Sequence, residues 1–132
     1  MPDEPSDARG LDPDRVPVAP IDLARAAARS ADEKNGRNIV VLDVGDVLAI
    51  TDFFVVVDAP NRRMVRALVD EIEESIRAVS GRSPVRVEGT REQQWVLIDY
   101  GDVVIHVFLD EVRRFYEIER LYRDVAHVDW AS

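Results

Sequence analysis

Two dense apolar stretches on either side of Gly101-Asp102 constrain the fold of this chain more than any other feature. The stretches are WVLIDY before the glycine and VVIHVFL after the aspartate. A glycine followed by an aspartate tolerates the positive φ angles that a two-residue hairpin turn needs. The sequence therefore predicts an antiparallel hairpin in which Tyr100 pairs with Val103 and the register follows outward.

This register divides the side chains of the hairpin into two faces, because successive side chains of a strand point to opposite sides. The first face is apolar throughout and comprises Val96, Ile98, Tyr100, Val103, Ile105 and Val107. The second, which we call the mixed face, comprises Trp95, Leu97, Asp99, Val104, His106 and Phe108. A slip of one residue would mix the two sets, so the register is a testable prediction.

The mixed face has two interpretations, whereas the apolar face belongs against a core. In one, a helix covers the mixed face, so that His106 is hydrogen-bonded and Trp95 is partly buried. In the other, the face binds a protein, because a tryptophan among apolar neighbours and a few polar groups has the composition of an interface anchor. We favour the second interpretation, with these candidate residues: Trp95, Leu97, Asp99, His106 and Phe108.

The composition along the chain divides it into three segments. Residues 1–19 are rich in proline, aspartate and arginine and poor in apolar side chains, which predicts a disordered acidic arm because little burial offsets the ordering entropy. Residues 20–123 form the expected domain, and residues 124–132 form a tail without a periodic pattern.

Apolar residues at helical spacing predict three helices. The first begins at Pro20, is expected to stop near Gly36, and repeats its apolar residues at Ile21, Ala24, Ala27, Ala28 and Ala31. The second follows the cap Asn61, ends at Gly81, and has its stripe on Val65, Leu68, Val69, Ile72, Ile76 and Val79. The third has Asp110 as its expected N-cap and an apolar side on Val112, Phe115, Tyr116, Ile118 and Tyr122.

Three further strands complete the pattern, at residues 38–44, 52–58 and 84–88. The first is almost continuously apolar, which is typical of burial on both faces and predicts a central strand. The element order is therefore α-β-β-α-β-β-β-α, and it favours an α/β fold in which helices pack on a mixed β-sheet.

Composition excludes several classes of function. The chain has 132 residues, enough for one domain, and no cysteine, which excludes disulfides and thiol catalysis. No apolar run is long enough to span a bilayer, and the N-terminus lacks an apolar signal region, so we expect a cytoplasmic protein. The net charge of −9 argues against binding carried by phosphate contacts. Little direct RNA contact is expected, although Arg62, Arg63 and Arg66 form a local basic cluster.

A catalytic or metal site is not expected. Asp99, Asp102 and His106 are close in sequence, but the register places Asp102 in the turn and leaves only two of the three on one face. Two side chains are a thin ligand set for a metal ion. The chain also lacks a glycine-rich phosphate loop and a G-x-S-x-G elbow, so we expect neither a cofactor nor an enzyme.

Four motifs together give the chain a family resemblance. They are ITDFFVVV (50–57), RRMVRALVDEIEE (62–74), VEGTREQQWVLIDYGDVVIHVF (87–108) and RRFYEIERLY (113–122). In this combination the sequence resembles the ribosomal silencing factor (RsfS, or Iojap) family over about residues 20–123.

The resemblance implies a fold similar to that of nucleotidyltransferases, without an established transferase activity. It implies binding to the large ribosomal subunit through its fourteenth protein, which blocks joining of the small subunit and represses translation under nutrient limitation. It also implies a role in large-subunit maturation and a homodimer when the protein is free. Carried over by position, the docking strand of the family points to Trp95, Val96, Asp99 and Tyr100.

The alternative from another functional class is a divergent nucleotidyltransferase. Such enzymes need a Gly-Ser motif followed by paired carboxylates that bind two metal ions. No Gly-Ser pair precedes Asp99 or Asp102 in this sequence.

Overall fold

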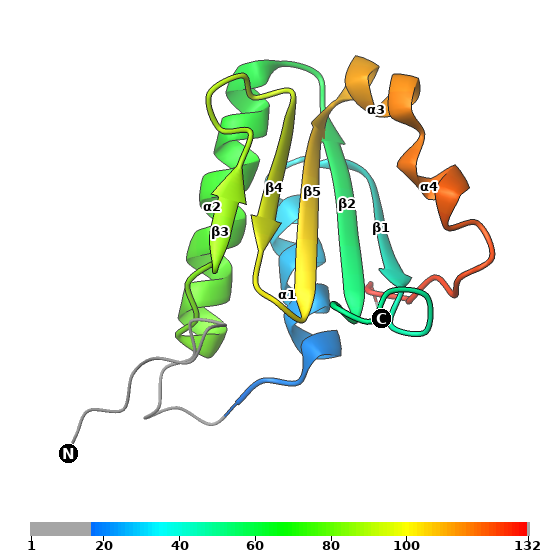
Figure 1. Cartoon of the computed structure of the whole chain (residues 1–132). Coiled ribbons are helices and arrows are strands. Elements are labelled where there is room, and N and C mark those ends of the chain that lie inside the picture. The colour runs from blue at the N-terminus through cyan, green and yellow to red at the C-terminus, as the bar shows by residue number, and fades with distance from the viewer. Residues whose placement is uncertain (1–16, 132) are drawn as a thin grey trace.

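A computed structural model describes residues 17–131 as a mixed sheet flanked by helices (Figure 1). The elements are α1 (Pro20–Glu33), β1 (Arg37–Asp43), β2 (Phe53–Ala59), α2 (Arg62–Ser80), β3 (Arg86–Glu88), β4 (Trp95–Asp99), β5 (Val103–Leu109), α3 (Asp110–Tyr116) and α4 (Ile118–Leu121). The α/β class and the mixed sheet are confirmed. Most of the expected N-terminal arm, residues 1–16, lies outside the described residues, while Val18 packs against the core.

The five strands follow the order β1-β2-β5-β4-β3. Neighbouring strands are antiparallel except for β2 and β5, which run parallel. Figure 1 shows α1 and α2 behind the sheet and α3 and α4 near its upper and right-hand edges. The front of β3, β4 and β5 carries no helix over most of its length. One face of the sheet is therefore covered by two helices and the other only in part.

The predicted register of the hairpin is confirmed. Trp95 pairs with Phe108, Leu97 with His106 and Asp99 with Val104. The amide of Tyr100 donates to the carbonyl of Val103 over 2.9 Å, which closes the turn. The apolar face of the hairpin belongs to the core cluster beneath α1 and α2, whereas apolar side chains of the mixed face belong to a second, smaller cluster on the other side of the sheet.

The prediction that residues 38–44 form a central strand is wrong. β1 is an edge strand that pairs along its length with β2 alone, and the central strand is β5, all of whose residues are buried. The apolar run in β1 has another cause. Val41 packs in the cluster beneath the helices and Leu42 in the cluster on the opposite face, so both sides of this edge strand are covered.

The second helix begins and ends where the sequence predicts. The Asn61 side chain accepts a hydrogen bond from the amide of Met64 over 2.9 Å, and Gly81 adopts a left-handed φ of 74° after the last turn. The apolar stripe is shorter than expected, because Val79 is 49% exposed. The apolar stripe ends at Ile76, and the buried residue in the last turn is the polar Ser80.

The last helix differs from its prediction in two ways. Leu109, not Asp110, is the N-cap, and no side chain caps the helix. The helix also breaks at Glu117, whose φ of 48° separates α3 from α4. Because of this break, Ile118 is buried, whereas Phe115 and Tyr116 are 78% and 52% exposed instead of lying on a buried side.

The C-terminal tail covers the free edge of β1. The amide of Asp43 donates to the carbonyl of Ala126 over 2.9 Å, and the amide of Val128 donates to the carbonyl of Val41 over 2.8 Å. The indole Nε1 of Trp130 donates to the carbonyl of Ile39 over 3.3 Å. The residues without a periodic pattern thus pair with the sheet, where they satisfy backbone groups that an edge strand would leave open.

Candidate functional site

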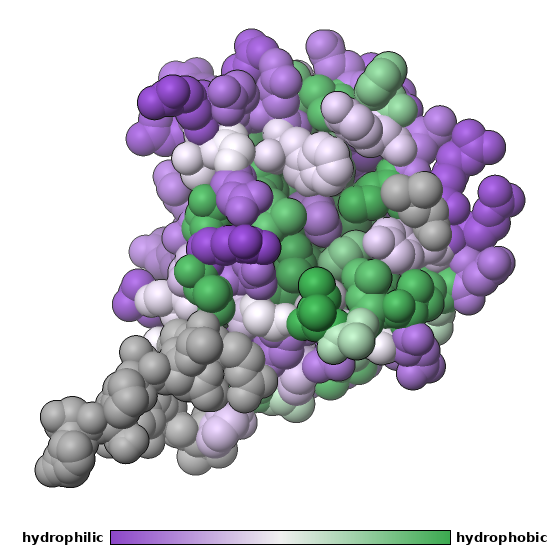
Figure 2. Space-filling model, in the orientation of Figure 1, coloured by the Kyte–Doolittle hydropathy of each residue, from purple (hydrophilic) through white to green (hydrophobic). Residues whose placement is uncertain are grey.

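The mixed face forms the open side of the sheet. Figure 2 shows a narrow run of apolar side chains over β4 and β5, and a larger apolar group at the lower right, near the loop between β1 and β2. The strand pairing places six side chains of the hairpin on this side, since residues opposite each other share a face. A shallow hollow of about 380 Å³ lies at its margin and is lined by Glu88, Gly89, Trp95 and Leu97.

Trp95 is the centre of an aromatic cluster on this face. Its indole Nε1 donates a hydrogen bond to Nδ1 of His106 over 3.1 Å. Its ring lies 4.8 Å from that of Phe108 and 5.0 Å from that of Tyr116, measured between centroids. The Trp95 side chain is half-buried, so it presents part of a large apolar ring in a fixed orientation.

His106 lies beneath Trp95 and is 4% exposed. Burial lowers the pKa of its imidazole from 6.5 to about 4, because the charged form would lose its hydration. Nδ1 accepts the hydrogen bond from the indole N–H, so the neutral ring carries its own proton on Nε2. Phe54 packs edge-on against this ring at 4.6 Å. The histidine is therefore a neutral acceptor that orients the tryptophan.

Asp99 and Leu97 continue the mixed face toward the hairpin turn. Oδ1 of Asp99 accepts a hydrogen bond from the amide of Gly101 over 2.7 Å, and Oδ2 lies 3.3 Å from Nε of Arg86. Asp99 thus stabilises the turn through one oxygen and pairs with the neighbouring strand through the other. Leu97 is half-buried and adds an apolar side chain between Asp99 and Trp95.

The structure divides the seven candidate residues into three groups. Trp95, Leu97 and Asp99 reach the surface of the mixed face, while His106 and Phe108 are buried beneath them on the same face. Val96 and Tyr100, which the family resemblance added, are 1% and 0% exposed and lie on the opposite, helix-covered face. Their side chains are separated from the mixed face by the sheet.

Two exposed aromatic residues extend this face and were not expected there. Tyr116 contacts Trp95, and Phe115 contacts Tyr116 with a ring separation of 5.0 Å. Helical periodicity assigned both to a buried side, because the break at Glu117 is not visible in the apolar pattern. Arg86 of β3 also joins the face, through a pairing with Asp99 that depends on the sheet order.

A buried ion network attaches α3 and α4 to the sheet. A guanidinium nitrogen of Arg113 lies 3.0 Å from the carboxylate of Asp58 on β2, and the same guanidinium bonds to Glu119 on α4. Arg113 and Asp58 are 6% and 3% exposed. Burial alone would raise the pKa of Glu119, but the hydrogen bond from Arg113 lowers it, so this carboxylate stays charged. The network fixes Tyr116 beside Trp95.

The acidic residues of the hairpin do not converge with His106. Asp102 is buried and pairs with Arg82, whose guanidinium is 2.9 Å away, while Asp99 is engaged by Arg86 and Gly101. Within residues 17–131, no group of three or more potential ligands could bind a metal ion. Over the same residues, none of the helices combines the length and the apolar character that a bilayer crossing requires.

Comparison with known proteins identifies the family. Residues 17–132 match the family model described as ribosomal silencing factor during starvation. The chain belongs to the RsfS family. The match includes the C-terminal tail that pairs with β1, beyond the range of the sequence motifs.

Three individual proteins are similar to this chain over two thirds of its length or more. The ribosomal silencing factor RsfS of Halalkalibacterium halodurans is 32% identical over 108 residues, which are 82% of this chain and 92% of that protein. A crystal structure of a Chromobacterium violaceum protein has a TM-score of 0.77 and 28% identity, with 87% of this chain and 98% of that chain covered. The mouse protein named mitochondrial assembly of ribosomal large subunit protein 1 is 33% identical over 92 residues, which are 68% of this chain and 40% of that protein.

Proposed function

We propose that this RsfS-family protein binds the large ribosomal subunit through its mixed face and represses translation by steric occlusion. The bound domain would occupy the surface that the small subunit needs, so repression requires no chemical step. We expect this to act under nutrient limitation, in the cytoplasm, where ribosomes work. The partner in this proposal is the fourteenth protein of the large subunit, with little direct contact to RNA.

The observation that carries the proposal is the Trp95 cluster. Trp95 is half-exposed, is oriented by a partly buried hydrogen bond, and lies beside exposed Tyr116, which in turn contacts exposed Phe115. Rigid aromatic side chains with little conformational entropy to lose are typical anchors of protein interfaces. The net charge of −9 favours a protein or basic surface over a phosphate backbone. The large subunit also appears in the name of the mouse relative, which supports a further role in large-subunit maturation.

Co-sedimentation with purified large and small subunits tests the proposal. Leu97→Glu places a charge in the centre of the mixed face, and because Leu97 is only half-buried, the fold should tolerate it. We expect binding to large subunits to weaken by at least about thirtyfold, the effect of losing an interface anchor. Trp95→Glu should do the same, although it also removes the hydrogen bond to His106, so its thermal unfolding must be measured in parallel.

Val79→Glu is the matched control, because it also replaces an exposed apolar residue by an acid but lies on α2, away from the mixed face. It should co-sediment like the wild type. In a joining assay, wild-type protein should lower the yield of complete ribosomes, while Leu97→Glu should not. Normal co-sedimentation of a folded Leu97→Glu protein would show that the mixed face is not the docking surface.

The same face would serve a homodimer when the protein is free. An apolar patch of this kind is more stable when it is covered, so two copies would compete with the ribosome for it. Light scattering should then detect a dimer for the wild type and a monomer for Leu97→Glu. If the two proteins have the same mass, the free protein does not dimerise through this face.

A further inference from the structure

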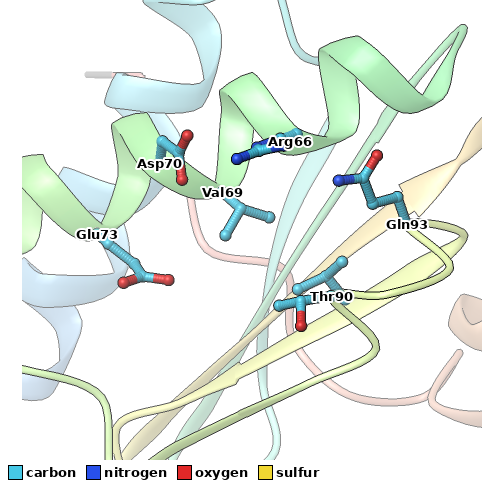
Figure 3. Close-up of a pocket in the computed structure, with 7 residues that line it drawn as sticks. Arg66, Val69, Asp70, Glu73, Thr90 and Gln93 are labelled. Atoms are coloured by element: carbon cyan, nitrogen blue, oxygen red, sulfur yellow. The ribbon is translucent and has the colours of Figure 1, made fainter.

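A second concave site lies on the helix-covered side of the sheet, between α2 and the loop that joins β3 to β4 (Figure 3). Its volume is about 340 Å³, within the range of pockets that bind small ligands. It is lined by Arg66, Val69, Asp70, Glu73, Thr90, Gln93 and Val96. These residues are separate from the surface residues of the mixed face, except that Val96 adjoins Trp95 in the chain.

The charges in this pocket have an ordered arrangement along α2. Arg66 comes first, Asp70 follows about one turn later and Glu73 about one turn after that. At 1.5 Å of rise per residue, the arginine and the glutamate lie about 10 Å apart along the helix axis. Figure 3 shows Thr90 and Gln93 on the facing loop. The pocket therefore has a cationic end and an anionic end.

Within the described residues, the polar side chains that line the pocket form no hydrogen bonds or ion pairs with one another. Among residues 17–131, no hydrogen bond or ion pair engages the side chains of Arg66, Asp70, Glu73, Thr90 or Gln93. Burial raises the pKa of Glu73 and the charge of Asp70 raises it further, while the charge of Arg77 opposes part of the shift. Arg66, Asp70 and Thr90 are exposed, and Glu73 and Gln93 are half-buried, so these polar groups are accessible to a ligand that enters the hollow. Val69 and Val96 add an apolar wall.

We propose that this pocket binds a small aliphatic zwitterion, whose carboxylate pairs with Arg66 and whose ammonium pairs with Asp70 and Glu73. A guanidinium suits a carboxylate because its planar fork donates two parallel hydrogen bonds. Two neighbouring carboxylates favour a cation and repel a purely anionic ligand such as phosphate. Arg66 in turn repels a purely cationic ligand such as a polyamine. The aliphatic body would lie on the two valines.

This proposal does not depend on ribosome binding, because the pocket and the mixed face are on opposite sides of the sheet. The probe is L-leucine, which has both charges and an aliphatic body. Its matched analogues are isopentylamine, which lacks the carboxylate, and 4-methylpentanoate, which lacks the ammonium. Methyl resonances of Val69 and Val96 in the full-length chain report directly on occupation of the pocket.

We expect saturable shifts of both valine methyls with leucine, and binding at least about tenfold weaker for each analogue, because each loses one charge-assisted interaction. Arg66→Gln should weaken leucine binding by at least about tenfold and should not weaken isopentylamine binding, because the variant also removes the repulsion between Arg66 and a cationic ligand. Glu73→Gln should weaken isopentylamine more than 4-methylpentanoate. Arg63→Gln, on the same helix but outside the pocket, is the matched control and should bind leucine like the wild type.

Three results would overturn the proposal. The first is the absence of saturable shifts with leucine up to its solubility limit. The second is equal binding of leucine and both analogues, which would indicate an apolar site without charge recognition. The third is wild-type affinity for leucine in the folded Arg66→Gln variant.

Discussion

The hydrogen bond between Trp95 and His106 fixes the orientation of the Trp95 ring. It should also make the stability of the protein depend on pH. The two residues lie on neighbouring strands, diagonally across the hairpin, because Leu97 rather than Trp95 is directly opposite the histidine. The imidazole must stay neutral for Nδ1 to accept the hydrogen bond from the indole N–H. A protonated ring would be a donor at both nitrogens and would be charged in an apolar cluster.

The free energy of unfolding should therefore fall in acid. The pKa of His106 is about 4 in the folded chain, against 6.5 for the unperturbed group, so the unfolded state binds more protons between these values. The contribution is fully present above pH 6.5 and is lost as the pH falls toward 4, by about 3 kcal/mol in all. Chemical denaturation between pH 4 and 7 measures this loss.

His106→Phe should remove this component, because phenylalanine does not titrate and suits the aromatic cluster. His127→Gln is the control, since His127 is exposed and its variant should retain the acid sensitivity of the wild type. An identical pH profile for wild type and His106→Phe would contradict the assignment of this titration to His106.

The loop between β3 and β4 positions Trp95 through a close backbone approach at Gly89. Gly89 has a φ of 87°, and a Cβ atom there would lie 2.1 Å from the carbonyl oxygen of Trp95. Only glycine avoids both the left-handed penalty and this clash. The same loop forms one wall of the pocket beside α2. Its conformation therefore affects both the position of Trp95 on the mixed face and the shape of the pocket on the opposite face.

Gly89→Ala should destabilise the protein by more than about 2 kcal/mol, since the left-handed conformation alone costs roughly 1–2 kcal/mol and the clash adds to it. The variant should also bind large subunits less well, because the start of β4 must shift. Thermal unfolding and co-sedimentation measure the two effects. Gly45→Ala is the control, because its nearest atom would be 3.4 Å away, and a similar loss of stability there would refute the steric explanation.

α3 and α4 are short helices that depend on the Arg113 network for their position. Seven residues and four residues respectively are too few for stable helices in isolation. Arg113 joins both helices to Asp58 on β2. The aromatic residues that extend the mixed face are on α3, so we expect this ion pair to affect the mixed face as well as stability.

Arg113→Leu should cost about 3–5 kcal/mol, because it leaves the buried carboxylate of Asp58 without its cation. Adding Asp58→Asn should recover part of this loss, since the remaining group is neutral. Arg114→Leu, at a 72% exposed side chain, should change stability by less than about 0.5 kcal/mol. Equilibrium denaturation of the three variants checks the expectation, and equal effects at positions 113 and 114 would contradict it.

At the scale of the whole domain, segments from both ends of the chain meet at one edge of the sheet. β1 comes early in the sequence, but its open edge is covered by residues 126–128 near the C-terminus. The tail is irregular because it follows the edge of the sheet instead of packing an amphipathic face. It protects β1 from pairing with another chain, a hazard of exposed apolar edges.

Val128→Pro should detach the C-terminal tail from β1, because proline lacks the amide that donates to the carbonyl of Val41. We expect faster hydrogen exchange at the amide of Asp43, which depends on Ala126, and greater aggregation at high concentration. Ala131→Pro is the control, since within residues 17–131 its amide donates to the Asp129 side chain and not to β1. Unchanged protection of Asp43 in Val128→Pro would mean that the tail does not depend on this bond.

Local sequence patterns determined most of the elements of this protein and one complete strand pairing. Asn61 and Gly81 mark the ends of α2 because caps are local interactions. The hairpin register follows from a two-residue turn and strict alternation, so the composition of the mixed face was predictable from residues 95–108. The surface residues Trp95, Leu97 and Asp99 follow from the same pattern.

The tertiary structure alone decided which of these elements are neighbours and which side chains are exposed. The apolar pattern of β1 is typical of a central strand, but β1 is an edge strand. Its two faces are buried by the two apolar clusters on either side of the sheet, and its open edge is covered by the C-terminal tail. Tyr116 looks buried but lies beside Trp95, because a left-handed Glu117 and a buried ion pair redirect the chain. Burial depends on contacts between residues that are distant in sequence, and a local sequence pattern does not identify those contacts.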